Sequence, residues 1–245
     1  CNNCWAKSFF GRKNSKKKKW VTQLSYKREN KLLNRTVKSY VKARNRLSKK
    51  NKLLLNTSPT KFFFKDKDFQ SFNFLNPEQK NILEIGFGDG GNLLINARQN
   101  LDSFYIGIEV YEMGVANVLN IAETEGIDNL KVILGDAVDV LEKNNHFSCF
   151  DEVIIFFPDP WPKRKHNKRR LISENFLMNI KKIMRENGTL RIKTDWQDYA
   201  DEIEIYLKKV FKNYKEAADQ KLDSITKYEK IALAEKRKIS YFEVY

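Results

Sequence analysis

From Asn81 onward, short apolar segments alternate regularly with segments of helical periodicity, and this order leaves few folds open to the chain. The apolar segments predict strands at residues 82–85, 104–108, 131–134, 152–156, 189–193 and 239–244. The patterns between them predict helices at residues 92–99, 112–125, 137–141, 174–186 and 198–211. Apolar strands that alternate with helices form a parallel sheet covered on both faces. We therefore expect a three-layer, doubly wound α/β fold.

Composition excludes several other classes of protein. The chain has 245 residues, 41% of them hydrophobic, which is enough for a full-size core and unlike a disordered protein. No apolar run approaches the roughly 18 residues that a membrane span needs. Three cysteines, Cys1, Cys4 and Cys149, cannot build a disulfide framework, which favours a reducing compartment. With His146 and His166 they also lack the spacing of a zinc site, so we expect no metal.

Positive charge is concentrated at the N-terminal end. Residues 1–55 contain 18 Lys and Arg and a single acid, Glu29, which gives a balance of +17. Residues 56–245 balance at −2. We therefore divide the chain into a basic arm, residues 1–55, and a nearly neutral domain, residues 56–245.

The basic arm has two interpretations. It can bind a polyanion such as RNA, or it can direct the protein to an organelle, and the four lysines at 16–19 fit both. The spacing of Leu33, Val37 and Val41 predicts a basic amphipathic helix at residues 31–50. The expected location is the cytoplasm, or a plastid or mitochondrion if the arm is a targeting segment.

The first predicted strand runs into a glycine-rich turn. Gly86, Gly88 and Gly91 match the G-x-G-x-x-G pattern of dinucleotide-binding sheets. Glycines let the backbone turn sharply and let a ligand approach without interference from Cβ. Such a turn lies at the carboxyl ends of the strands. A tight turn without a ligand is the alternative, because the pattern alone is common.

Acids follow successive strands at the same expected edge of the sheet. Glu109 ends the second strand, where a carboxylate can accept hydrogen bonds from ribose hydroxyls. Asp136 and Ala137 follow the third strand, where an adenine would lie, and Glu84 precedes the glycines. Each acid alone could be a helix cap or a solvated loop residue. Three at successive strand ends favour a nucleoside ligand.

Two nucleoside cofactors match these acids, NAD and S-adenosylmethionine. A dinucleotide places its pyrophosphate at the helix N-terminus. S-adenosylmethionine instead carries a cationic sulfonium and an ammonium group. Glu84 and Asp89 would repel a pyrophosphate and attract these cations, so they favour S-adenosylmethionine.

A stiff loop follows the fourth strand. Pro158 and Pro160 flank Asp159 and fix the direction of its carboxylate. Trp161 can pack beneath the loop or stack on a base. The basic run at residues 163–170 comes next, and although such runs are often solvated surface, its position favours contact with RNA.

These motifs occur together in the order of a known family. The segments concerned are residues 86–91, 107–110, 136–137, 158–170, 194–196 and 226–229. They resemble the bacterial-type tRNA (guanine-N7-)-methyltransferases, and residues 39–48 resemble the basic segment ahead of that family's domain. The glycine turn is generic, but the Pro-Asp-Pro-Trp loop with its basic tail and the late Thr-Lys-Tyr-Glu are specific. The resemblance implies a seven-stranded class I methyltransferase sheet whose last strand is antiparallel.

The resemblance also implies an activity, the methylation of guanosine 46 in the tRNA variable loop at N7, with S-adenosylmethionine as methyl donor. It assigns the cofactor site to Glu84, Gly86, Gly88, Glu109, Asp136, Ala137 and Asp159. It assigns the tRNA side to Lys163, Asp195, Thr226, Lys227, Tyr228 and Glu229. Asp159 would be the catalytic residue.

The chemistry of guanine agrees with acidic side chains. N7 has a free lone pair and no proton, so the enzyme needs to place it in line with the methyl group. Guanine N1–H and N2–H₂ donate hydrogen bonds, which makes Asp159, Asp195 and Glu229 the expected clamps. Asp159 would also stabilise the positive charge that develops on the purine. The alternatives are that Asp195 caps the following helix and that Glu229 pairs with a lysine.

Three rival functions stay open. An NAD-dependent oxidoreductase would need a turn that accepts a pyrophosphate, and a non-catalytic RNA-binding subunit would need only the fold. An exocyclic-amine methyltransferase would have a related loop, but typically an amide or acid followed by two prolines. For the favoured function we expect tRNA as partner, a monomer or homodimer, no obligatory partner subunit and no membrane.

Overall fold

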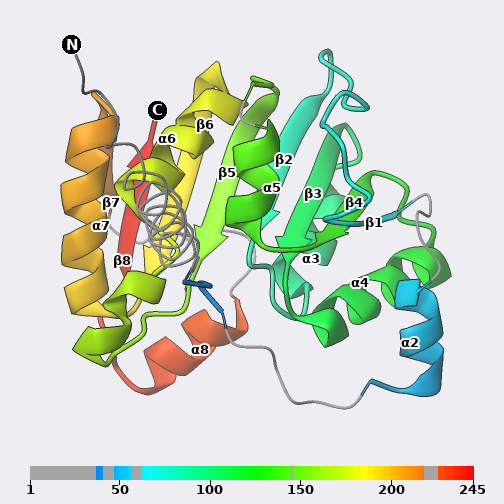
Figure 1. The fold of residues 1–245 in the computed structure, drawn as a ribbon, viewed down its shortest axis with the longest axis horizontal. Helices are drawn as coiled ribbons and strands as arrows, with labels where there is room; N and C mark the ends of the chain where they lie inside the picture. Colours follow the sequence, from blue (N-terminus) through cyan, green and yellow to red (C-terminus); the bar gives the residue numbers. More distant parts are fainter. Residues whose placement is uncertain (1–36, 41–46, 57–61, 145, 218–225) are drawn as a thin grey trace, which may run out of the picture. The chain divides into compact units, whose positions relative to one another are not determined.

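One mixed β-sheet organises the domain (Figure 1). The computed structural model describes residues 37–40, 47–56, 62–144, 146–217 and 226–245. Within them the strands follow the order β1-β4-β3-β2-β5-β6-β8-β7. Their bounds are β1 Phe63–Lys65, β2 Lys80–Ile85, β3 Ser103–Glu109, β4 Leu130–Leu134, β5 Phe150–Phe156, β6 Met184–Thr194, β7 Tyr214–Ala217 and β8 Ser240–Val244. The order reverses between β2 and β5, so the sheet is doubly wound from β2.

The strand directions confirm the predicted fold class. The strands from β1 to β6 pair in parallel, and β8 runs antiparallel to both β6 and β7. The described part of the sheet has eight strands rather than the expected seven, because β1 adds to the edge by pairing Phe63 with Val132. A three-residue strand inside a connector rich in Phe and Lys has no periodicity that would predict it.

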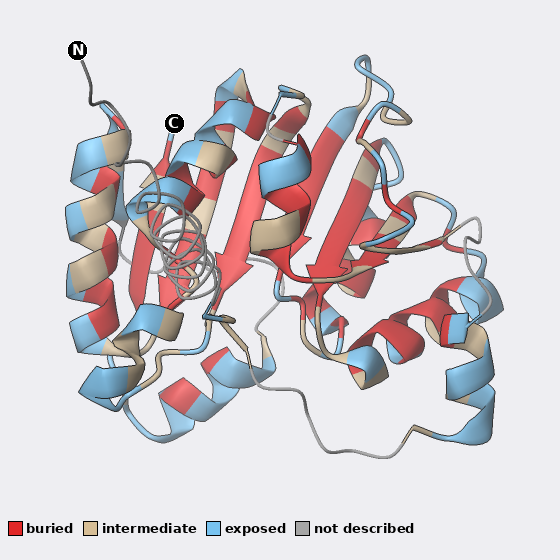
Figure 2. Ribbon diagram, in the orientation of Figure 1, coloured by how far each residue is buried: buried red, intermediate tan, exposed pale blue. Residues whose placement is uncertain are grey.

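Helices cover both faces of this sheet. They are α2 Lys49–Asn56, α3 Gly91–Gln99, α4 Glu112–Glu125, α5 Ala137–Asn144, α6 Glu174–Ile183, α7 Gln197–Val210, α8 Lys227–Ala234 and the short 3₁₀ helix η1 Arg164–Arg169. One apolar cluster joins the sheet to α5, α6 and α7, and another joins it to α3 and α4. Figure 2 shows the central strands buried and the outer sides of the helices exposed. The helices and strands predicted from residue 81 onward are all present, with shifted ends, whereas α2, α8, β1 and β7 were not predicted.

The helix α6 shows where the sequence pattern predicts an end wrongly. Ser173 caps its first turn by accepting a hydrogen bond from the Phe176 amide (3.3 Å). The helix then buries an apolar stripe against the sheet, as its spacing predicts. The periodicity predicts helix to residue 186, but α6 ends at Ile183. The chain straightens there so that Met184 can pair with Phe150 in the sheet.

Most of the predicted basic arm lies outside the described residues. This holds for residues 1–36 and for most of the helix predicted at residues 31–50. Where that helix is described, the prediction is wrong at residues 37–40 and 47–48, which are not helical. From the end of the predicted arm, Lys49–Asn56 forms α2, which packs against α4 and buries Leu55. The division of the chain at residue 55 stays a prediction. Among the described residues, no helix has both the length and the apolar character that crossing a membrane requires.

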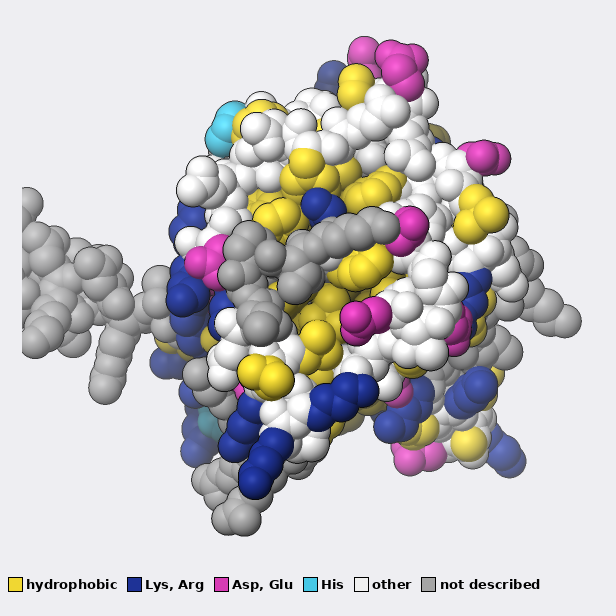
Figure 3. Space-filling model, turned by 90° about the vertical axis from the view of Figure 1, so that its right-hand side faces the viewer, with side chains coloured by type: hydrophobic (Ala, Val, Ile, Leu, Met, Phe, Trp, Pro, Cys, Tyr) yellow, Lys and Arg dark blue, Asp and Glu magenta, His cyan; other side chains and the backbone are white. Residues whose placement is uncertain are grey.

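Aromatic side chains surround the edge strand β1. The Phe64 ring lies 5.8 Å from the Phe69 ring and 5.9 Å from the Phe74 ring. The Lys131 ammonium lies 4.9 Å and 4.4 Å from the centroids of Phe64 and Phe74. Figure 3, which views the side of β1 and α2, shows apolar side chains gathered on this face. The Lys131 ammonium thus makes cation–π contacts with two rings of this aromatic cluster.

The helix α4 approaches the glycine turn more closely than a side chain would allow. A Cβ at Gly114 of α4 would lie 1.8 Å from the carbonyl oxygen of Gly88. A Cβ at Gly90 would lie 2.0 Å from Cγ2 of Val118, and Gly90 also has a left-handed backbone with φ +85°. The shape of the turn therefore depends on contact between its backbone and the first turn of α4.

We expect Gly114→Ala to destabilise the domain by about 2 kcal/mol, although alanine favours a helix more than glycine does. The added methyl group would collide with a backbone carbonyl that cannot move without distorting the glycine turn. Urea unfolding measures the change. The matched control is Gly126→Ala after α4, where a Cβ would meet open space and only the φ of +68° opposes it, with an expected cost of about 1 kcal/mol. A Gly114→Ala variant more stable than wild type would contradict the expectation.

Candidate functional site

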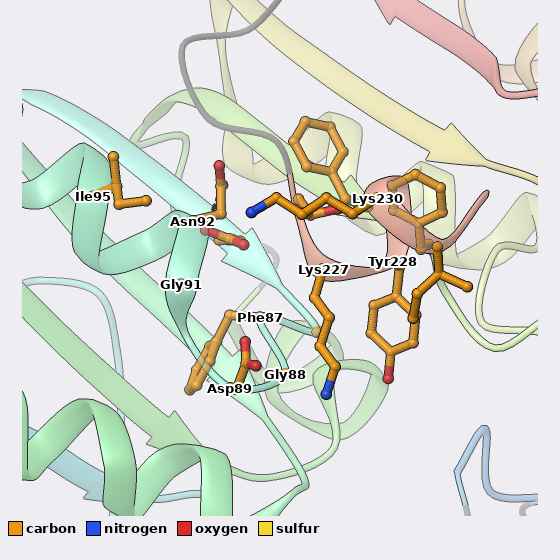
Figure 4. Close-up of a pocket in the computed structure, with 15 residues that line it drawn as sticks. Phe87, Gly88, Asp89, Gly91, Asn92, Ile95, Lys227, Tyr228 and Lys230 are labelled. Carbon is orange, nitrogen blue, oxygen red and sulfur yellow. Dashed lines mark hydrogen bonds between the residues drawn. The ribbon is translucent and has the colours of Figure 1, made fainter. Parts of the chain in front are cut away.

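A cavity of about 430 Å³ lies at the carboxyl edge of the sheet, where the strand order reverses. The glycine turn and α3 form one wall, and the end of β5 with α8 forms the other (Figure 4). The lining residues are Glu84, Gly86, Phe87, Gly88, Asp89, Gly91, Asn92, Ile95, Phe156, Phe157, Thr226, Lys227, Tyr228, Lys230 and Ile231. The structure thus brings together predicted residues from both ends of the domain.

The glycine turn presents a bare backbone to the cavity. Gly86 and Gly88 have φ values of +75° and +61°, and a Cβ added at either position would meet no atom within 4 Å. Their amide groups are already engaged. The Gly86 N–H donates to the carbonyl of Ile108 (2.9 Å), and the Gly88 N–H donates to the Glu109 carboxylate (2.8 Å). A ligand can therefore approach this turn closely but finds these two donors occupied.

Glu109 fixes the turn from the end of β3. One carboxylate oxygen accepts from Gly88, and the other accepts from the amides of Val110 (2.6 Å) and Tyr111 (2.9 Å). Burial raises the pKa of this carboxyl above its ordinary value, while the three amides oppose the shift. A carboxylate has about four lone pairs, so Glu109 can still accept further hydrogen bonds.

Glu84 is a buried acid at the end of β2. Its side chain accepts a hydrogen bond from the Asn92 amide (3.0 Å). Burial raises the pKa of its carboxyl to about 7, and the charge of Glu109 adds to the rise. A carboxyl in this state favours a cation placed beside it, because a cation offsets the cost of burying its charge.

Asp159 lies in the loop after β5 and is not among the residues that line the cavity. Its side chain is exposed, yet the surrounding protein removes enough water to raise the pKa of its carboxyl. Burial raises the pKa of the Tyr228 hydroxyl, and the charge of Asp159 adds to that rise and to the one at Glu109. These electrostatic interactions place the Asp159 carboxyl near both groups.

Asp136 and Ala137 do not line the cavity. Asp136 is buried at the start of α5, where its carboxylate accepts a hydrogen bond from the Val138 amide (3.1 Å). This is the helix-cap role that its position before a helix allows. Their predicted contact with an adenine stays a prediction.

The Thr-Lys-Tyr-Glu motif begins α8. Thr226 and Glu229 form a capping box, in which the Thr226 hydroxyl accepts from the Glu229 amide (3.1 Å). Glu229 also pairs with Lys193 of β6 (2.7 Å), and both side chains are buried. Thr226, Lys227 and Tyr228 also line the cavity, and Figure 4 labels the last two. The alternative that Glu229 pairs with a lysine is thus what the structure contains, and the residue holds α8 in place.

Lys163 and Asp195 lie away from the cavity lining. Lys163 is exposed just before η1. Asp195 forms an ion pair with Arg237, which precedes β8, and it does not cap α7. The structure therefore gives Asp195 a cation partner that its sequence position did not indicate.

Several cavity residues were not predicted as site residues from the sequence: Asn92, Ile95, Phe156, Phe157, Lys230 and Ile231. The sequence could have indicated Asn92 as a site residue, because it is a polar residue on the side of the predicted helix 92–99 that faces the sheet. Nothing in the sequence indicated Phe157, because its ring stacks on Tyr228 of α8, which lies far along the chain (centroids 6.5 Å, interplanar angle 29°). Figure 4 shows Lys227 and Lys230 extending from α8 across the cavity toward the glycine turn and α3.

We expect Glu84→Gln to raise the melting temperature by a few degrees at about pH 8 and by less at about pH 5. Because the fold raises the pKa of Glu84 from 4.5 to about 7, the folded protein holds this proton more tightly than the unfolded chain. That stabilisation is complete below pH 4.5 and is lost as the pH rises through 7. The neutral amide of glutamine does not ionise, so the variant loses no stability at this position as the pH rises. Thermal unfolding at both pH values measures the effect, with the exposed Glu123→Gln of α4 as control, and a lower melting temperature at pH 8 would contradict it.

We expect Lys193→Met to destabilise the domain by about 3 kcal/mol, because it leaves the Glu229 carboxylate buried without its cation. Adding Glu229→Gln should recover part of the loss, since the second change removes the buried charge. Urea unfolding of the two single variants and the double variant gives the coupling. Additive effects of the two substitutions would show that the pair does not hold α8.

The sequence matches a family described as "Putative methyltransferase" over residues 78–242. A "tRNA (guanine-N(7)-)-methyltransferase" from Nitrosococcus oceani is 44% identical over 54% of this chain and 56% of that protein. A relative of the same name from Francisella philomiragia is 37% identical over 69% of this chain and 75% of that protein. The matched segment thus spans little more than half the length of the first relative. The similarity to the Francisella relative covers most of that protein and about two thirds of this chain. The chain therefore belongs to the tRNA (guanine-N(7)-)-methyltransferase family.

Proposed function

We propose that this protein transfers a methyl group from S-adenosylmethionine to N7 of a guanosine in tRNA, forming N7-methylguanosine. One observation carries the proposal: an open glycine turn borders the cavity, with the buried Glu84 in the cavity lining and Glu109 bound to the turn. The charge of Asp159, in the loop after β5, acts on Glu109. Desolvated carboxyl groups around a bare backbone suit a nucleoside ligand that carries cations. Membership of the family supports the same chemistry.

The glycine turn argues against a dinucleotide. A pyrophosphate would need free backbone donors at the start of α3. Glu84 and Asp89 line the cavity beside this helix end, and their charges would repel a pyrophosphate bound there. The NAD-dependent alternative is therefore not favoured.

The residues present fit S-adenosylmethionine. Glu109 would accept hydrogen bonds from the ribose hydroxyls through its remaining lone pairs. Glu84 would face the ammonium group, and Gly86 and Gly88 would leave room for the ligand. Asp136, with Ala137, would border the adenine. When bound, the cofactor supplies an electrophilic methyl group on its sulfonium.

Asp159 would act on the guanine in two ways. Its carboxylate would accept hydrogen bonds from N1–H or N2–H₂ and so hold N7 in line for the transfer. It would also stabilise the positive charge that the purine gains with the methyl group. Partial removal of water around Asp159 strengthens this electrostatic effect. No general base is required, because N7 carries no proton.

The helix α8 would hold the nucleotide around the reacting base. The ammonium groups of Lys227 and Lys230 would bind backbone phosphate. The exposed Tyr228 ring would stack on a base. Glu229 and Asp195 already have cation partners, so a contact between either carboxylate and the guanine would have to share it with Lys193 or Arg237.

Two features support tRNA as the nucleic acid. The relatives are named for it. Lys163 and the exposed part of the basic run that follows lie in sequence directly after the Asp159 loop, where they can contact phosphates. The proposal extends to guanosine 46 of the variable loop. We also propose that the protein acts in the cytoplasm as a monomer or homodimer, without an obligatory partner subunit.

We expect Asp159→Ala to lower kcat/KM for methyl transfer by about 100-fold or more, because it removes the group that orients the base and stabilises its developing charge. The assay measures transfer of a labelled methyl group from S-adenosylmethionine to unmodified tRNA, followed by nucleoside analysis. Asp102→Ala is the matched control, since this exposed acid precedes β3 at the opposite edge of the sheet.

Each outcome of this assay distinguishes one possibility. N7-methylguanosine from wild type, lost with Asp159→Ala and kept with Asp102→Ala, supports the proposal. A different methylated nucleoside would keep the cofactor and contradict the N7 assignment. Cofactor binding without any transfer would favour a non-catalytic RNA-binding subunit.

A further inference from the structure

One arginine of the basic run is buried, unlike its neighbours. Arg164, Lys165 and Lys168 are exposed on or beside η1, as expected for side chains that contact a phosphate backbone. Arg170 follows directly after η1, and its side chain is only 2% exposed. A side chain so enclosed has no free surface for nucleic acid.

The guanidinium of Arg170 joins the loop after β5 to α7. Its Nε donates to the carbonyl oxygen of Pro160 (3.0 Å), and its two terminal nitrogens donate to Asp198 (2.5 Å) and Glu202. It also lies 4.8 Å from the centroid of the Tyr199 ring. Two carboxylates of α7 therefore neutralise its charge and fix its plane, leaving Nε aimed at the loop.

The loop that Arg170 contacts needs an external support. Phe157 and Trp161, at its two ends, have left-handed backbones with φ values of 52° and 47°. This conformation costs free energy in any residue with a Cβ, and bulky residues adopt it only where their surroundings hold them. Trp161 is anchored by its indole N–H, which donates to the carbonyl of Ser39 (3.0 Å). The bond from Arg170 to Pro160 holds the stretch between these two residues, one position from Asp159.

We propose that Arg170 is a positioning residue, which fixes the Asp159 carboxylate through the carbonyl of Pro160 and makes no contact with tRNA. The proposal rests on the function proposed above. The proposal gives Arg170 a different role from the rest of the basic run, for which contact with phosphate is still expected. The two roles differ in what they change: a positioning residue affects the rate of the bound complex, whereas a phosphate contact affects affinity and its salt dependence.

The test compares Arg170→Lys with Arg164→Gln. Lysine keeps the positive charge of Arg170 but cannot bond Pro160, Asp198 and Glu202 at once. We expect Arg170→Lys to lower kcat at least tenfold while KM for tRNA and the salt slope of tRNA binding stay at wild-type values. Arg164→Gln should reduce the salt slope by about one phosphate contact. The exposed Lys182→Gln on α6 is the charge-loss control away from the loop.

A second readout does not depend on activity. The amides of Phe157, His166, Arg170 and Ile172 are hydrogen-bonded in the structure, so amide hydrogen exchange over residues 157–172 reports the order of the loop. We expect several-fold faster exchange in Arg170→Lys and no change in Arg164→Gln. Asp198→Asn removes one support of Arg170 at an exposed carboxylate, and it should give a smaller change of the same kind if Arg170→Lys fails to fold.

The outcomes separate the inference from the proposed function. A lower salt slope with unchanged loop exchange in Arg170→Lys would assign the residue to tRNA contact and overturn the inference. Faster loop exchange with normal kcat would also overturn it. If the wild-type protein transfers no methyl group, the proposed function fails, while the exchange data still decide whether Arg170 holds the loop.

Discussion

Gly88 is fixed at both of its polar backbone atoms, and the shape of the site follows from this. Its N–H donates to Glu109 at the end of β3, and its carbonyl lies against Gly114 in the first turn of α4. The absence of a side chain at Gly114 lets α4 approach the turn this closely. The turn, which with α3 forms one wall of the cavity, is therefore held from behind by β3 and α4.

The opposite wall is attached differently. The helix α8 has a capping box at its start and a buried ion pair from Glu229 to Lys193 in the sheet. A charge pair inside a protein is costly to separate, so it specifies where α8 sits more strictly than apolar packing would. The backbone contact of one wall and the ion pair of the other keep Lys227 and Tyr228 facing the glycine turn. Asp159 lies in the loop that follows β5, outside the cavity lining.

Local patterns predicted most of the fold, and tertiary pairing set what they missed. The strands β2 to β6 and β8 were predictable as short apolar runs, and the helices α3 to α7 were predictable from their helical period. The strand β1 is too short for a period, and the end of α6 depends on pairing between Met184 and Phe150. The glycine turn and its acids were recognisable from spacing along the chain.

The interaction partners of the site residues were harder to predict from the sequence. Glu229 and Asp195 were expected to bind guanine because the sequence shows their negative charge but does not show which basic residue pairs with each. Lys193 lies 36 residues before Glu229, and Arg237 follows Asp195 across β7 and α8. Which acid meets which base depends on the packing of the finished sheet, so the sequence alone could not separate the positioning residues from those that face the cavity.

The buried carboxyl of Glu84 also links ligand binding to proton exchange with solvent. With a pKa of about 7, it is about half protonated in neutral solution. A cation that settles beside it favours the charged form and displaces the proton that half of the molecules carry. The bulk buffer takes up that proton, so the heat measured on binding would vary with the ionisation enthalpy of the buffer chosen. Calorimetry in two buffers would thus count the protons released by the acids of the site, to which Glu84 contributes.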